Sequence, residues 1–81
     1  MIDEIELEIA TPKGVFTASF AKTAKVSEVI AAAISGMDLD GGDAFDLMND
    51  GEILQPVERT LVSFGLSGTV QLELVATGSG V

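Results

Sequence analysis

A single amphipathic helix is predicted by residues 26–37, which read VSEVIAAAISGM. Apolar side chains recur there at positions i, i+3, i+4, i+7, i+8 and i+11, and this spacing places them in one continuous stripe along a helix. We expect Thr23 or Ser27 to cap the first turn, and the negative charge of Glu28 to be stabilised by the positive end of the helix dipole. Gly36 should end the helix in the left-handed conformation. The stripe consists of Val26, Val29, Ile30, Ala33, Ile34 and Met37.

Two strands are predicted before this helix. Residues 5–9 read IELEI, and such alternation of apolar and acidic side chains is typical of a strand with one buried face and one face in water. Residues 11–14 read TPKG; the proline fixes φ and the glycine can take a positive φ, so the chain should reverse there. A second strand is then expected over about residues 15–20, which completes an N-terminal hairpin.

A second hairpin is predicted after the helix. In residues 45–48, FDLM, the first and third side chains should face the core, and the second and fourth should face outward. Residues 49–51, NDG, are a strong hairpin turn signal, so residues 52–54 should return as a short strand.

The remaining elements define the fold class. Pro56 should end the short strand, residues 60–66 should form an irregular or 3₁₀ segment, and residues 70–74 alternate again as a last strand. The helix can hide its stripe only against one face of a mixed sheet, in which the last strand lies beside the first at the centre. We therefore predict an α+β domain of the β-grasp type over residues 1–76, with about four to five strands packed on one helix.

Composition excludes several classes of function. The chain has 81 residues, no cysteine and no histidine, so there is neither thiolate chemistry nor the commonest general base and metal ligand. No serine, threonine or aspartate has a base beside it, and we expect neither an enzyme nor a catalytic residue.

Charge indicates the kind of partner. Thirteen acidic residues against four basic ones give a net charge of −9, which should repel nucleic acids and anionic membranes and favour a basic protein partner. We find no secretion signal and no apolar stretch of membrane-spanning length, so we expect a cytoplasmic protein.

The closing third of the chain resembles ubiquitin-like proteins. Residues 58–66, ERTLVSFGL, followed by residues 69–74, TVQLEL, are similar to the Arg-Thr-Leu step that leads to the last strand of that family. Residues 47–54 resemble the segment before it, and residues 25–30 resemble the start of the family's helix. The resemblance covers about residues 5 to 78 and implies the ubiquitin-like β-grasp fold.

The resemblance also implies a role for the tail at residues 77–81, TGSGV. In conjugated members a C-terminal glycine is adenylated, because without a Cβ it can thread a narrow channel. Gly78 and Gly80 occupy this place, and a peptidase would first have to remove Val81. The chain is similar to bacterial ubiquitin-like modifiers encoded with an ATP-using activating enzyme, a conjugating enzyme and a deubiquitinase-like peptidase. These enzymes and the target proteins are the expected partners, and the domain itself needs no cofactor.

A partner-binding surface is predicted on the second hairpin and the last strand. Met48 stands where ubiquitin has the central isoleucine of its recognition patch, and Glu73 replaces the valine of its last strand. Together with Asp46 they would form a small acidic patch, in which Met48 should be exposed.

Other interpretations stay open. The tail could be a frayed terminus, and the domain could be a non-covalent adaptor of the kind found in secretion systems. A sulfur carrier is a third alternative, although such proteins end in Gly-Gly and this chain does not. Asp38, Asp40 and Asp43 suggest a calcium loop, but the ligand pattern fails at Gly42, Asp43 and Asn49, so we expect no metal site.

Overall fold

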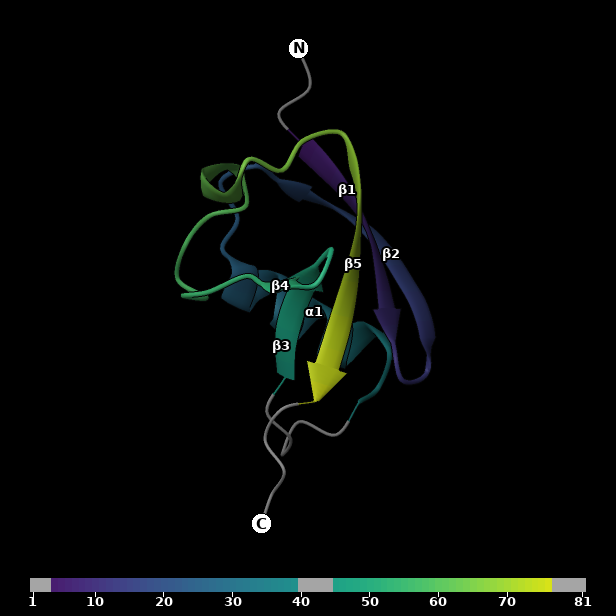
Figure 1. The fold of residues 1–81 in the computed structure, drawn as a ribbon. Helices are drawn as coiled ribbons and strands as arrows, with labels where there is room; N and C mark the ends of the chain where they lie inside the picture. Colours follow the sequence, from purple (N-terminus) through teal and green to yellow (C-terminus); the bar gives the residue numbers. More distant parts are fainter. Residues whose placement is uncertain (1–3, 40–44, 77–81) are drawn as a thin grey trace.

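One mixed sheet and one α-helix make up the part of the chain that the computed structural model describes, residues 4–39 and 45–76 (Figure 1). This architecture confirms the predicted β-grasp fold. The elements are β1 (Glu4–Thr11), β2 (Gly14–Ala21), α1 (Val26–Gly36), β3 (Phe45–Asn49), β4 (Glu52–Ile53), the 3₁₀ helix η1 (Val62–Phe64) and β5 (Thr69–Ala76).

The five strands lie in the order β2-β1-β5-β3-β4. The first and last strands pair in parallel at the sheet centre, as predicted, and the other neighbours pair antiparallel. In the turn between β3 and β4, Asp50 and Gly51 both have positive φ, 53° and 85°, which is the signature of the type I′ turn that suits a two-residue hairpin.

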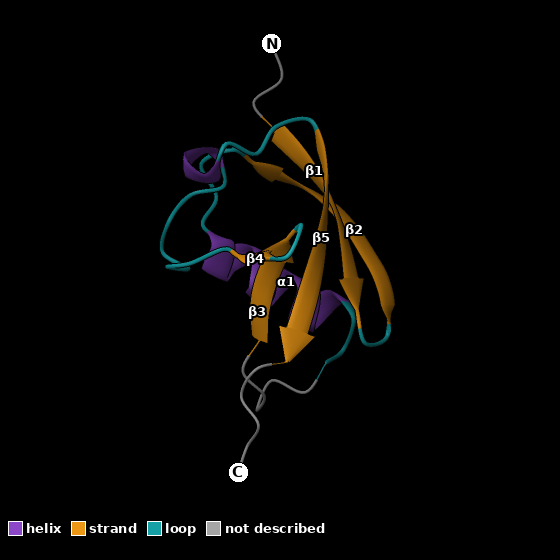
Figure 2. Ribbon diagram, in the orientation of Figure 1, coloured by secondary structure: helices purple, strands orange, loops and turns teal. Residues whose placement is uncertain are grey.

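The core lies between α1 and one face of the sheet (Figure 2). Alternate side chains of the central strands point into it, and Val26, Val29 and Ala33 meet them from the helix. No polar or charged residue is buried among the described residues, so the core is held by apolar burial. Its strand members are Ile5, Leu7, Ile9, Leu47, Leu72 and Leu74.

The start of α1 differs from the prediction, because neither Thr23 nor Ser27 is the N-cap residue. Lys25 occupies that position, and its N–H donates to Oε2 of Glu28 at 2.7 Å. The N–H groups of Val26 and Ser27 donate to carbonyl oxygens of a later loop, at 3.0 and 2.9 Å. Since that loop supplies acceptors that a capping side chain would otherwise provide, the helix needs no serine or threonine cap.

The end of α1 differs as well. Gly36 remains within the helix, and Asp38 takes the left-handed conformation with φ of 53°. The N–H of Leu39 donates to the carbonyl of Ile34 at 2.9 Å, as in a Schellman end. Glycine is suited to position 36 for another reason: a Cβ there would overlap the Phe16 ring.

This contact predicts the effect of Gly36→Ala. Alanine favours a helix by about 0.5–1 kcal/mol, but overpacking typically costs about 1–3 kcal/mol. We expect a net loss of about 1 kcal/mol in the free energy of unfolding, measured in urea. In a Phe16→Leu background the same change should be neutral or stabilising. Equal losses in both backgrounds would show that the ring is not the cause.

Candidate recognition surface

The face of the sheet opposite α1, here called the outer face, carries the predicted binding residues. Asp46 and Met48 alternate with the buried Leu47 on β3, and Glu73 lies between two buried leucines on β5. Met48 pairs with Glu73 across β3 and β5, so these two side chains are neighbours. Asp46 lies one step further along, opposite Val75. The structure thus brings the three predicted residues together on one surface.

Met48 is half-buried, contrary to the prediction that it is exposed. The cause is its position between two strands, with Glu73 on one side and Ile53 of β4 on the other. Ile53 itself is 41% exposed, and Val75 is half-buried on the same face. Met48, Ile53 and Val75, bordered by Asp46 and Glu73, form a surface that we call the β3 patch.

Ile53 and Val75 did not emerge from the sequence as binding residues. The alternation along residues 70–74, extended by one residue, would have placed Val75 on the outer face. Ile53 belongs to a strand of two residues, which is too short for a periodicity signal. Its orientation becomes clear only from its pairing with Met48.

The predicted conjugation residues Gly78 and Gly80, and also Val81, lie outside the described residues, as do Asp40 and Asp43 of the rejected calcium loop. Within residues 4–39 and 45–76, no group of three or more acidic side chains is placed to hold a metal ion. Over the same ranges, no helix has the length and apolar character needed to cross a membrane.

Basic side chains are absent from all five strands of the described fold. The chain has four lysine and arginine residues. Lys13 lies in the first turn, where its Nζ donates to the carbonyl of Asp38 at 2.8 Å. Arg59 donates to the Ser63 carbonyl at 2.8 Å and lies over the Phe64 ring, 4.5 Å from its centroid. The outer face is therefore acidic, because none of the five described strands contributes a lysine or arginine to it.

Two hydroxyl groups on the described surface donate to backbone carbonyls of their own turns. The Oγ1 of Thr11 donates to the Gly14 carbonyl at 2.8 Å, and the Oγ of Ser63 donates to the Thr60 carbonyl at 2.7 Å. The protons of these two hydroxyls are thus directed to backbone acceptors. The arrangement suits recognition by shape and charge.

Comparisons with known proteins place the fold. No family model matches the chain, and no curated protein matches it. Among solved structures, the ubiquitin-like domain of an Arabidopsis thaliana protein is 16% identical with a TM-score of 0.80, over 99% of this chain and 84% of that one. Caldiarchaeum subterraneum ubiquitin is 20% identical with a TM-score of 0.79, over 96% and 99%.

A designed protein based on ubiquitin is also similar, at 20% identity and a TM-score of 0.81, over 96% of this chain and 94% of that one. Each of these similarities extends over most of this chain and most of the compared structure. The chain therefore has the ubiquitin-like β-grasp fold.

Proposed function

We propose that this chain is a ubiquitin-like protein modifier, joined to target proteins through Gly80 in the cytoplasm. The observation that carries the proposal is the ubiquitin-like fold, whose last strand ends at Ala76, just before a tail that contains Gly78 and Gly80. Such a domain supplies recognition, and its partner enzymes supply the chemistry.

The proposed reaction has three stages. A peptidase hydrolyses the amide bond between Gly80 and Val81, which leaves a carboxylate on Gly80. That carboxylate attacks the α-phosphate of ATP in the activating enzyme, and an acyl-adenylate forms with release of pyrophosphate. A cysteine thiolate then displaces AMP, and after transfer to the conjugating enzyme an amine or hydroxyl of the target displaces the thiol.

In this proposal the β3 patch is the surface that the partner enzymes bind. A flexible thioether beside the partly exposed Ile53 suits an adaptable apolar contact, and the bordering carboxylates favour a basic rim on the partner. Glu73 stands where ubiquitin has an apolar residue, so we propose enzymes specific for this chain and no recognition by ordinary ubiquitin-binding domains.

The intact mass of the chain tests the proposal. An N-terminally tagged chain, recovered from its native cells with the neighbouring genes present, should lack the mass of Val81. Heavier species should also be present, in which Gly80 is joined to another protein. A single species that retains Val81 would contradict the proposal.

A non-covalent adaptor is the second candidate, and the β3 patch favours it because that surface does not depend on the tail. An adaptor would act with Val81 in place. The same mass measurement separates the two functions, since only the modifier is processed and carries adducts.

A further inference from the structure

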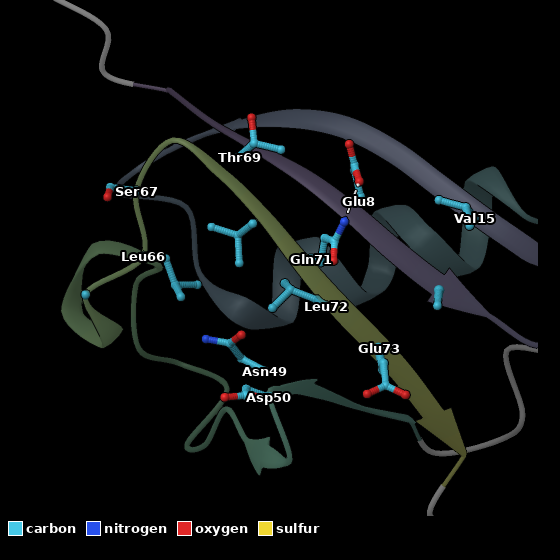
Figure 3. A pocket seen from close by; sticks show the side chains of 13 residues that line it. Glu8, Val15, Asn49, Asp50, Leu66, Ser67, Thr69, Gln71, Leu72 and Glu73 are labelled. Atoms are coloured by element: carbon cyan, nitrogen blue, oxygen red, sulfur yellow. Dashed lines mark hydrogen bonds between the residues drawn. The ribbon is translucent and has the colours of Figure 1, made fainter.

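An open groove of about 910 Å³ crosses the outer face beside the β3 patch. Its floor is made by β1 and β5, and the turn between β3 and β4 contributes to its wall (Figure 3). Val15 of β2 also lines it and is 64% exposed. Glu8, Asp50 and Glu73 line the groove, and no lysine or arginine is among its described lining residues.

Three carboxylates follow one another on the outer face of β1 and β5, at Glu6, Glu8 and Glu73, and we call them the acidic row. Glu8 and Glu73 line the groove, and Glu6 lies one step beyond its described lining. In the parallel register of β1 and β5, Glu6 pairs with Thr69 and Glu8 pairs with Gln71. The next pair whose side chains are on the outer face is Ala10 with Glu73, so the third carboxylate comes from β5. The row therefore advances by two residues at each step, about 7 Å along a strand, and its last step also crosses from β1 to β5, about 5 Å to the side.

Neutral donors hold the first two carboxylates of the row. Thr69 Oγ1 donates to Glu6 Oε1 at 3.5 Å, and Gln71 Nε2 donates to Glu8 Oε1 at 3.3 Å (Figure 3 shows the second pair). Each contact uses one side of a carboxylate, which can accept about four hydrogen bonds. Both donors are uncharged, and each hydrogen bond leaves further acceptor sites on its carboxylate.

We propose that the groove binds an extended basic segment of a partner protein, with an arginine or lysine at every second position. Alternate side chains of an extended segment point the same way at a spacing of about 7 Å, which matches the advance of the acidic row along the strands. The sideways step to Glu73 is within the reach of a long basic side chain. The aliphatic stem of the basic residue over Glu73 would lie on Ala10 and Val15, which pair across β1 and β2. Arginine suits the site best, because its guanidinium binds a carboxylate through two hydrogen bonds.

Charge favours this occupant over two others. A second copy of the chain would bring its own net charge of −9 to the acidic row, and a nucleic acid would bring its phosphates. The inference rests on the proposed function for the view that the outer face is a recognition surface, but it does not require the tail to be conjugated.

The test uses the purified chain and a short acetylated peptide in which arginine alternates with serine. Calorimetry measures the Kd, and backbone amide chemical shifts locate the peptide. The double variant Glu8→Gln/Glu73→Gln removes two charges from the groove and keeps the side-chain lengths. The control Glu52→Gln/Glu58→Gln removes the same charge from residues that do not line the groove.

We expect the groove variant to raise the Kd about fivefold or more and the control to raise it less than about twofold. The shifts should concentrate on β1 and β5, and replacement of the peptide arginines by glutamine should abolish binding. Thermal unfolding is the control for folding, and both variants should unfold cooperatively.

Equal weakening by both double variants would overturn the inference, because net charge alone would then explain binding. Shifts confined to α1 or the free edge of β2, equal affinity for the glutamine peptide, or self-association of the chain at the groove would also overturn it. None of these results would affect adduct formation through Gly80. Conversely, a tail without adducts would leave peptide binding unchanged, so the two proposals fail separately.

Discussion

Gly80→Asp should abolish adduct formation by this chain in cells that contain its partner enzymes. Glycine has no Cβ, so its backbone fits a narrow channel and its carbonyl stays open to a nucleophile. Aspartate adds both bulk and a negative charge next to the carboxylate that must attack ATP. We therefore expect complete loss of the heavier species, measured by intact mass and by immunoblot of the tagged chain.

Ser79→Ala is the matched control, since it alters the same tail and keeps a small side chain. It should leave adduct formation close to that of the unmodified chain. Both variants should unfold at the same temperature as the parent chain, because the core is built from residues before the tail. Normal adducts from Gly80→Asp would exclude conjugation at Gly80.

The strands were predictable because local patterns encode them. Alternation in residues 5–9 and 70–74 identified the two central strands, and the NDG turn identified the pairing of β3 with β4. The apolar stripe of the helix also predicted most of the residues that meet the core: Val26, Val29 and Ala33 are fully buried, and Ile30 packs against them. These signals are local, since each depends on the side-chain period of one element.

The errors concern features that depend on distant residues. The helix start is satisfied by the carbonyls of Val57 and Arg59, which are about thirty positions away in the chain. Gly36 accommodates the ring of Phe16 from another element, which no pattern within the helix indicates. In both cases a tertiary contact replaced the local rule that the prediction had used.

The candidate site shows the same division. Met48 and Glu73 were predicted to be close, and their pairing across β3 and β5 places them together. The acidic row, in contrast, combines β1 with β5 in a parallel register. Parallel partners are joined by a long connection and not by a turn, so the sequence holds no local signal for that register.

The loop that holds the helix start is also a point of vulnerability in the core. Leu61 follows the Arg-Thr pair of this loop, is fully buried and donates its N–H to the Ala24 carbonyl at 2.9 Å. Leu61→Ala would leave a cavity between the loop and the start of α1. Such changes cost about 2–5 kcal/mol, and a domain of this kind has only about 5–15 kcal/mol in total.

We therefore expect Leu61→Ala to lower the free energy of unfolding by about 3 kcal/mol in urea denaturation. Val62→Ala is the control, because the neighbouring Val62 is 46% exposed, and it should cost less than about 0.5 kcal/mol. Similar losses from both variants would mean that Leu61 does not anchor the loop. If Leu61 is the anchor, its loss should also free the helix start, so that the amides of Val26 and Ser27 exchange hydrogen faster than in the Val62→Ala chain.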